Sequence, residues 1–347
     1  MKAALIGAGA IARQHLSCLK TLKDVEIAAV CDLSPAVAES AAERYGVRSW
    51  FTDYAAMLRD VKPDVVHVTT PPTSHFRLAM DSLEAGAHVI VEKPATVKFA
   101  ELEELVRCAS ANGLAVIEDY NYLFNHATRE IFKWTQDGTL GGVVHVDVMI
   151  ALNLFGPGGF ADANNRHPAL ALAGGALADF LPHLASLAYL FIGAHERAHA
   201  VWTTRRPSIL PYDELHAVVE GARGTATLGF SSTAQPDAFW LRVFGERGHA
   251  STNLFETRLT LEKLRSGPKP LQPLKNGLEE GRAVRRAAVG TLLRKFKAGP
   301  GTYDGMWYLV ARIYEALAQG TKLPVPVEDV LAVNRMVEAL KPVEARS

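Results

Sequence analysis

The chain opens with Lys2-Ala3-Ala4-Leu5-Ile6-Gly7-Ala8-Gly9-Ala10-Ile11-Ala12, and this stretch decides its fold. The apolar residues 2–6 are typical of a short buried strand, and the pattern G-x-G-x-x-A that follows is typical of a tight turn into a helix. In this pattern Gly7 allows the turn, Gly9 lets a ligand approach the backbone, and the small Ala12 lets the helix pack against the strand. Free N–H groups and a partial positive charge at a helix start bind phosphate, so the turn predicts a pyrophosphate site.

An acidic residue follows the glycine turn at the end of the next strand. Residues 25–30 predict that strand, and Asp32 comes after it, about 20–25 residues past the glycines, where a carboxylate accepts hydrogen bonds from the adenosine ribose. Such a carboxylate repels a 2′-phosphate, so the residues predict NAD in preference to NADP. Lys23 and Ser34 nearby leave NADP possible, and a solvated Asp in an ordinary turn is the alternative interpretation.

Size and composition limit the class of protein. The 347 residues, 48% apolar and 21% charged, suffice for about two globular domains. The formal net charge is zero and we find no apolar run near the roughly 18 residues of a membrane helix, so we expect neither a nucleic-acid partner nor a membrane span. The first strand starts at the N-terminus, so no signal peptide is expected. The three cysteines lie far apart and show no metal-ligand spacing, so we expect reduced thiols and no metal site. Reduced thiols are typical of a cytoplasmic protein, which is the location that we expect.

The pattern of predicted elements changes near residue 121. Over residues 1–121 apolar runs alternate with helical segments, which predicts an α/β domain with a doubly wound parallel sheet. Over residues 122–347 we expect an α+β domain, because strand candidates follow one another between about 195 and 263 without a long helix, as in a mostly antiparallel sheet. Helices are expected near 35–44, 74–85, 98–111, 127–137, 177–191, 279–297, 303–319 and 327–340.

The strand pattern of the second domain also predicts that the protein forms oligomers. If its helices cover one face of the sheet, strands such as 225–230 and 240–244 leave a broad face of side chains on the other. We expect that face to be an apolar patch, which monomers rarely expose. Symmetric pairing would cover it, so we expect a homodimer or a homotetramer.

Polar loops follow two predicted strands of the first domain. They are Thr70-Pro71-Pro72-Thr73-Ser74-His75, with a Ser or Thr cap for the next helix, and Glu92-Lys93-Pro94. Ligands bind beyond the carboxyl ends of the strands in such sheets, so these loops are candidates for contact with cofactor and substrate. A capped surface turn and an exposed Glu–Lys ion pair are the structural alternatives.

A third motif lies in the second domain, in Gly174-Gly175-Ala176-Leu177-Ala178-Asp179-Phe180-Leu181-Pro182-His183. The two glycines permit close backbone approach. Asp179 and His183 are four residues apart and fall on one face of a helix, which suits a general base oriented by a carboxylate. A purely structural Asp–His pair is the alternative, and no further ligand pattern supports a metal.

In this order and spacing the four motifs resemble the Gfo/Idh/MocA family, the group of glucose–fructose oxidoreductase and inositol dehydrogenase, over nearly the whole chain. The resemblance implies a Rossmann domain, an open-faced sheet domain used for oligomer contacts, and NAD(P)-linked oxidation or reduction of a sugar or cyclitol. Lys93 matches the family's Glu-Lys-Pro lysine, and Asp179 and His183 match its Asp-x-x-x-His pair. Asn121 falls in a loop that contacts cofactor or substrate. Pro182 and the run 121–125 depart from the family pattern and leave the substrate open.

We therefore expect hydride transfer between nicotinamide and a carbinol or ketone of a sugar, sugar derivative or cyclitol. His183 would exchange the hydroxyl proton, Asp179 would hold the imidazole, and Lys93 would orient the same oxygen. The alternatives are a glycosidase or epimerase that retains NAD for transient oxidation, and a non-catalytic dinucleotide-binding regulator. The expected cofactor-binding residues are Gly7, Gly9, Ala10, Ile11, Asp32, Thr70, Pro71, His75, Glu92, Lys93 and Asn121.

Two further segments each allow more than one interpretation. Asn153, Asn165, Arg166 and His167 lie in a loop that either binds substrate hydroxyls or an anion, or is an ordinary surface loop. Residues 279–297 predict a basic amphipathic helix. It either recognises a phosphorylated or nucleotide-linked sugar, lies near a membrane surface, or is a solvated helix packed by its apolar side.

Overall fold

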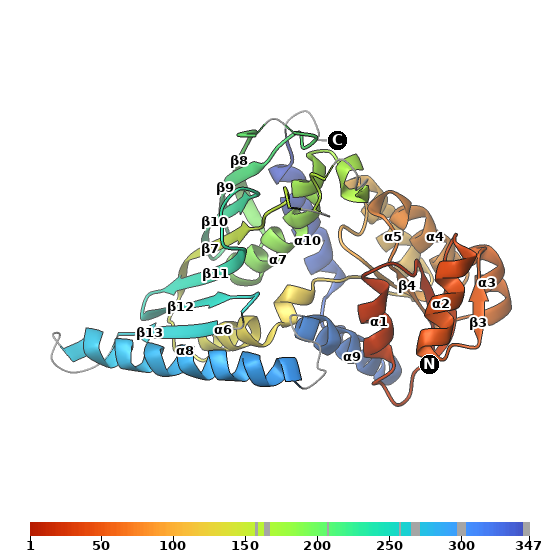
Figure 1. Cartoon of the computed structure of the whole chain (residues 1–347), viewed down its shortest axis with the longest axis horizontal. Coiled ribbons are helices and arrows are strands. Elements are labelled where there is room, and N and C mark those ends of the chain that lie inside the picture. The colour runs from red at the N-terminus through yellow and green to blue at the C-terminus, as the bar shows by residue number, and fades with distance from the viewer. Residues whose placement is uncertain are drawn as a thin grey trace. The chain divides into compact units, whose positions relative to one another are not determined.

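The computed structural model describes residues 1–156, 159–162, 167–206, 208–256, 258–264, 271–296 and 303–342. The chain divides into two compact units (Figure 1). The first contains Met1–Tyr120 and Met306–Leu331, and the second contains Asn121–Gly305 and the chain from Ala332. The predicted boundary at 121 lies beside the first break, but the segment from Met306 returns to the first unit, which the sequence pattern did not indicate.

The first unit is built on a six-stranded parallel sheet, as predicted. Its strand order, β3-β2-β1-β4-β5-β6, is that of dinucleotide-binding folds. The strands are β1 (Lys2–Ile6), β2 (Glu26–Cys31), β3 (Ser49–Phe51), β4 (Val65–Val68), β5 (His88–Val91) and β6 (Val116–Glu118). The helices are α1 (Ala12–Leu19), α2 (Pro35–Tyr45), α3 (Tyr54–Val61), the 3-10 helix η1 (Pro72–Ser74), α4 (His75–Glu84), α5 (Phe99–Ala111) and most of α9 (Asp304–Gln319).

The second unit is built on a seven-stranded sheet with the order β13-β12-β11-β7-β10-β9-β8. Only β7 and β10 pair in parallel, so the sheet is mostly antiparallel, as predicted. The strands are β7 (Val143–Ala151), β8 (His195–Thr203), β9 (Glu214–Gly221), β10 (Gly224–Ser231), β11 (Ala238–Gly245), β12 (Gly248–Asn253) and β13 (Arg258–Lys263).

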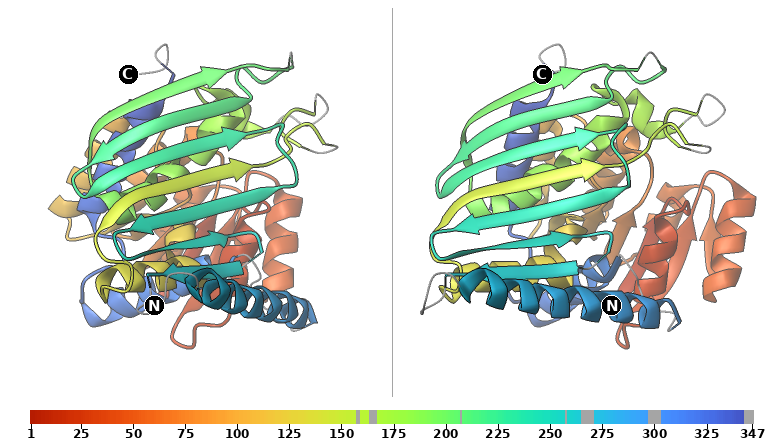
Figure 2. Two further views of the ribbon diagram at one scale, coloured as in Figure 1. Left: turned by 90° about the vertical axis from the view of Figure 1, so that its left-hand side faces the viewer. Right: turned by 60° about the vertical axis from the view of Figure 1, so that its left-hand side comes forward.

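Helices cover one face of this sheet and leave the other uncovered among the described residues (Figure 2). α7 packs on β7, β9 and β10, α6 packs on β11 and β12, and α8 lies along β13. The helical segments are η2 (Asn121–Phe124), α6 (His126–Gln136), η3 (Pro168–Ala171), η4 (Gly175–Phe180), α7 (Leu181–Ile192), α8 (Gln272–Phe296) and α10 (Val327–Leu340), which the two units share.

The uncovered face carries a mixture of apolar and polar side chains, where the sequence predicted an apolar patch. Strand alternation turns Leu228 and Leu241 toward the helices, where both are buried. The other face is mixed: Asp147 accepts hydrogen bonds there from His145 and Thr227, and Met149 and Trp240 line a hollow on the same face. The prediction overestimated the apolar character of this face, because it counted the apolar residues of both faces together.

The apolar segment Gly175–Ile192 corrects another expectation. Its mean hydropathy of 1.4 over 18 residues makes it long and apolar enough to cross a membrane, contrary to our reading of the sequence. However, 78% of this window is buried within the structure. Because α7 packs on the sheet, the segment has the character of a core helix.

The three cysteines are unpaired within the described part of the chain. Burial raises the pKa of the Cys18 thiol to about 12 and that of Cys31 to about 11, so both remain protonated and unreactive at neutral pH. Cys108 is half-buried.

Helix α8 begins earlier than predicted, at Gln272. Leu274, Leu278 and Val289 on it are mostly exposed, while Val284 is half-buried. Its role stays open.

Candidate functional site

Gly7 joins the ends of three strands of the parallel sheet. Its N–H donates to the carbonyl of Cys31 at the end of β2, at 2.8 Å, and its carbonyl accepts from the Thr69 hydroxyl after β4, at 2.6 Å. Its φ is +94°, and a Cβ atom would lie 2.8 Å from the Thr69 carbonyl oxygen. Only glycine fits both the backbone angle and the space.

The backbone beyond Gly7 is open. Gly9 and Ala10 are exposed, Ile11 forms the N-cap of α1, and Ala12 is fully buried against the sheet. A Cβ atom on Gly9 would meet nothing within 4 Å. This empty cradle at a helix start fits a pyrophosphate, which binds to exposed N–H groups at such a position.

Asp32 is tied to the same turn. Its Oδ2 accepts from the N–H of Ala8 at 2.8 Å, and its Oδ1 accepts from the N–H of Ser34 at 2.9 Å. An ionised carboxylate offers about four acceptor positions, so capacity remains for the hydroxyls of a ribose. Leu33, 91% exposed, offers an apolar surface beside it that suits an adenine base.

The loop after β4 includes Thr70, which is half-buried, and Pro71, which is exposed. The Ser74 hydroxyl lies 2.8 Å from both Thr70 Oγ1 and the Pro71 carbonyl, instead of capping α4 as expected. Contacts of Thr70 and Pro71 with a cofactor stay a prediction.

His75 has a different position from the one expected for direct cofactor contact. Its side chain is fully buried, with Nδ1 2.8 Å from the Pro94 carbonyl and Nε2 2.7 Å from the Thr70 carbonyl. Burial lowers the pKa of this imidazole. A neutral imidazole carries one N–H, so His75 donates to one of these two carbonyls, and its full burial between the two loops leaves no exposed edge for a ligand.

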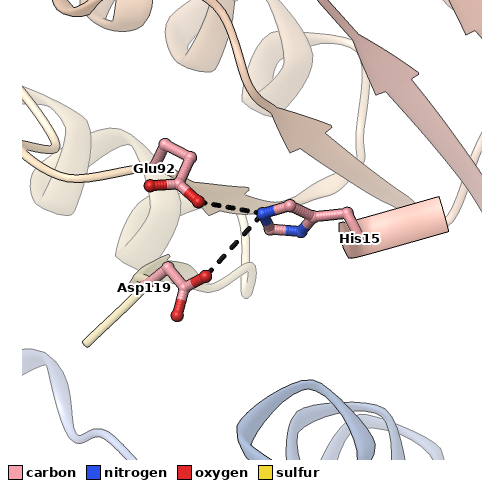
Figure 3. A group of neighbouring side chains, drawn as sticks. All are labelled: His15, Glu92 and Asp119. Atoms are coloured by element: carbon pink, nitrogen blue, oxygen red, sulfur yellow. Dashed lines mark hydrogen bonds and ion pairs between the residues drawn. The ribbon is translucent and has the colours of Figure 1, made fainter. Parts of the chain in front are cut away.

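Glu92 is buried, so the alternative of an exposed ion pair with Lys93 does not hold. Its Oε1 lies 3.1 Å from Nε2 of His15 on α1 (Figure 3). Its Oε2 accepts from the N–H of Lys93 at 3.2 Å. Lys93 itself is half-buried. Asp119, just after β6, places Oδ2 3.7 Å from the same His15 nitrogen.

Burial and mutual charge set the protonation of this group. Burial disfavours the imidazolium, but the carboxylates of Glu92 and Asp119 outweigh it and raise the pKa of His15. Burial and the charge of Glu92 raise the pKa of Asp119 to about 7. An imidazole with a raised pKa therefore faces Glu92, and the neighbouring Asp119 is partly protonated near neutral pH. Sequence reasoning missed His15 and Asp119, although Asp119 lies at a strand end where ligand-binding residues gather.

In the second unit, Asp179 and His183 lie on consecutive helical segments rather than on one helix. Asp179 is half-buried on η4 and His183 is 8% exposed in the first turn of α7. Pro182 occupies the start of α7, where its missing N–H costs no hydrogen bond. Gly175, with φ +66°, comes so close to Pro211 that a Cβ atom would lie 2.7 Å from its Cδ, as the close-approach prediction requires.

Tyr122 on η2 holds the ring of His183 edge-on, with ring centroids 4.8 Å apart at 86°. Tyr122 packs in the same way on Phe239, at 4.7 Å. Burial raises the pKa of the Tyr122 hydroxyl. Sequence reasoning missed this contact, because nothing in the local pattern pairs residue 122 with residue 183.

The remaining predicted ligand residues differ in their surroundings. Asn121 is buried, and its Oδ1 has no hydrogen-bond partner among the described residues, which suits contact with a bound molecule. The Oδ1 of Asn153 accepts from the N–H of Phe155, and Nδ1 of His167 accepts from the N–H of Ala169, so both side chains shape the local backbone. Asn165 and Arg166 lie outside the described residues.

Two family models match the chain. Residues 1–120 match the oxidoreductase family with an NAD-binding Rossmann fold, and residues 128–251 match the GFO/IDH/MocA C-terminal domain. The chain belongs to the GFO/IDH/MocA family of oxidoreductases. Its first unit is the family's NAD-binding Rossmann domain.

Relatives with a named activity match only in part. The D-glucoside 3-dehydrogenase of Escherichia coli K12 is 34% identical over 194 residues, which are 56% of this chain and 54% of that protein, so the chain spans about half of this relative. The NADP-dependent D-xylose 1-dehydrogenase 2 of Haloferax volcanii is 28% identical over 66% of this chain and 68% of its own. A levoglucosan dehydrogenase structure in complex with NADH superposes with a TM-score of 0.78, at 16% identity, over 100% of this chain and 96% of the other, and so shares the fold.

The two glycines of the turn give a matched pair of variants. We expect Gly7→Ala to lower the free energy of unfolding by about 1–3 kcal/mol, because its Cβ meets the Thr69 carbonyl in a backbone conformation that alanine disfavours. Gly9→Ala should leave that free energy within about 0.5 kcal/mol of wild type. It should nevertheless weaken NADH binding, because the new methyl group fills the cradle.

Urea unfolding and NADH fluorescence titration measure these two effects. Equal stability losses in both variants, or unchanged NADH affinity in folded Gly9→Ala, would contradict the assigned roles.

Proposed function

We propose that the protein transfers a hydride between a nicotinamide dinucleotide and a carbinol or ketone of a sugar, a sugar derivative or a cyclitol. The observation that carries this proposal is the open glycine turn at the strand ends of the Rossmann domain, held by the carboxylate of Asp32. The activities of the D-glucoside 3-dehydrogenase and the D-xylose 1-dehydrogenase support the substrate class.

We assign the chemistry to Lys93, Asp179 and His183. Bound NAD supplies the hydride acceptor. In oxidation His183 takes the proton of the substrate hydroxyl, Asp179 stabilises the charged imidazole, and Lys93 orients the same oxygen with its ammonium group. The low exposure of His183 and its contact with Tyr122 support the role of base, because a fixed ring keeps one nitrogen aimed at the reacting proton.

A screen of sugars and cyclitols with NAD and NADP at 340 nm tests this proposal. Release of one NADH per substrate oxidised supports a dehydrogenase. Turnover of a sugar without net NADH release would support instead an epimerase or glycosidase that retains its cofactor. Dinucleotide binding without turnover on any substrate would favour a regulator.

The cofactor preference rests on Asp32. We expect tighter binding of NADH than of NADPH, because the carboxylate repels a 2′-phosphate. Asp32→Ala should narrow the difference between the affinities for NADH and NADPH. It also removes the hydrogen bond from the Ala8 N–H, so it should lower the midpoint of thermal unfolding. Calorimetric titration of both dinucleotides measures the preference. Equal or tighter NADPH binding by the wild type would show that Asp32 does not face the ribose.

The catalytic assignment is tested by substitution. We expect Lys93→Ala and His183→Ala to lower kcat/KM by at least about 10²-fold, because each removes a group that acts on the reacting oxygen. Asp179→Asn should lower it as well. NADH affinity, measured by fluorescence, should change little. Near-normal turnover in His183→Ala would require another base.

We also propose that two copies pair through the uncovered face of the seven-stranded sheet. On this face Val201 and Val218 are 49% and 57% exposed, beside a hollow lined by Met149 and Trp240. We expect Val218→Lys to weaken association, since it places a charge in the contact, whereas the variant should keep its fold. Light scattering measures the mass in solution, and a mass near 37.6 kDa at micromolar concentration would contradict the pairing.

The free thiols support a cytoplasmic location, which is part of this proposal.

A further inference from the structure

The imidazole of His15 is fully buried on α1, the helix that follows the glycine turn. Its Nε2 lies 3.1 Å from Oε1 of Glu92, whereas Asp119 Oδ2 is farther away, at 3.7 Å (Figure 3). Glu92 is only 8% exposed, so its carboxylate has lost almost all contact with water and depends on donors from the protein. His15 is a side-chain donor that faces it.

The other oxygen of this carboxylate faces the main chain of the next residue. The N–H of Lys93 donates to Glu92 Oε2 at 3.2 Å. One carboxylate thus connects the imidazole of His15 to the backbone of Lys93. Any rotation of the Glu92 side chain away from His15 also releases the Lys93 backbone.

Two more groups fix the orientation of the His15 ring. Its Nδ1 lies 2.9 Å from Nδ1 of His67 on β4, and Nε2 of His67 lies 2.9 Å from the hydroxyl of Tyr314 on α9. With Glu92 ionised, Nε2 of His15 must be a donor, and one hydrogen between the two Nδ1 atoms satisfies both rings. The imidazole therefore cannot turn without breaking a buried hydrogen bond.

We propose that His15 is a positioning residue for Lys93: it holds the carboxylate of Glu92, and Glu92 holds the turn from which the Lys93 side chain projects. This inference rests on the proposed function, in which Lys93 orients the reacting hydroxyl. His15 touches neither substrate nor cofactor in this scheme. It acts on the rate only through the position of Lys93.

The test compares variants of His15 that differ in one hydrogen bond. His15→Leu removes the donor to Glu92, and we expect kcat to fall about 10- to 100-fold, since small displacements of a positioned group have effects of this size. His15→Gln places an amide nitrogen near the position of Nε2, and it should recover most of the lost kcat. The Kd for NADH should stay within about threefold in both variants, because the glycine turn is unchanged.

Cys18→Ala is the matched control, because Cys18 is equally buried on the same helix and its thiol bonds to the carbonyl of Trp307 rather than to His15 or Glu92. It should leave kcat unchanged even if the thermal midpoint falls. If His15→Leu does not fold, His15→Asn replaces it, because the shorter amide does not reach Glu92.

A second set of variants shows whether His15 acts through Lys93. In a Lys93→Ala background, His15→Leu should cause no further loss of kcat, because the group that it positions is gone. A further loss of kcat of tenfold or more in the double variant would overturn the positioning role and leave the proposed function intact. The same conclusion would follow if His15→Leu alone kept the wild-type kcat while Lys93→Ala alone lowered it. Wild-type kcat in Lys93→Ala would overturn the assigned role of Lys93 and that of His15 with it.

Discussion

The close approach of Gly7 to the carbonyl of Thr69 is the constraint on which the first unit depends. No side chain fits between them, and the contact brings the ends of β1 and β4 together at the point where the strand order reverses. Because the ends of β1, β2 and β4 meet there, the loops that follow these strands gather at one edge of the sheet. The open backbone of Gly9, the carboxylate of Asp32 and the loop after β4 all have their places as a consequence.

Two carboxylates at strand ends each stabilise a loop by accepting a hydrogen bond from a main-chain N–H. Asp32 accepts from the N–H of Ala8 and thereby holds the glycine turn, and Glu92 accepts from the N–H of Lys93 and holds the next ligand loop. Asp32 is half-buried, so water can share the stabilisation of its charge. Glu92 is buried and needs a cation, because a buried charge without a partner is strongly destabilising. This requirement explains a histidine with a raised pKa within an otherwise apolar helix face.

The sequence predicted the order of the elements and the glycine turn well, because both depend on local patterns. The strand 65–68 and the helix near 35–44 correspond to β4 and α2, since apolar runs and proline at a helix start are local signals. The short strand β3 gave no such signal. The return of α9 to the first unit depends on long-range packing, such as the bond between His67 and Tyr314, which no local pattern records.

The site was predictable only where a residue belongs to a motif at a strand end. Asp32 and Lys93 were found in this way. The burial of His75 was not, because its two carbonyl partners come from different loops. The polar side chains of the uncovered sheet face were also missed, because register decides which side of a strand faces the helices.

Hydrogen–deuterium exchange with and without NADH tests the central claim that the dinucleotide binds at the glycine turn. The account predicts slower exchange of the amides of residues 8–12 and 32–34 when NADH is bound, because these amides would face the pyrophosphate and the ribose. Exchange in strands β8 to β13 should change little. Saturating NADH that leaves the exchange of residues 8–12 unchanged would contradict the account.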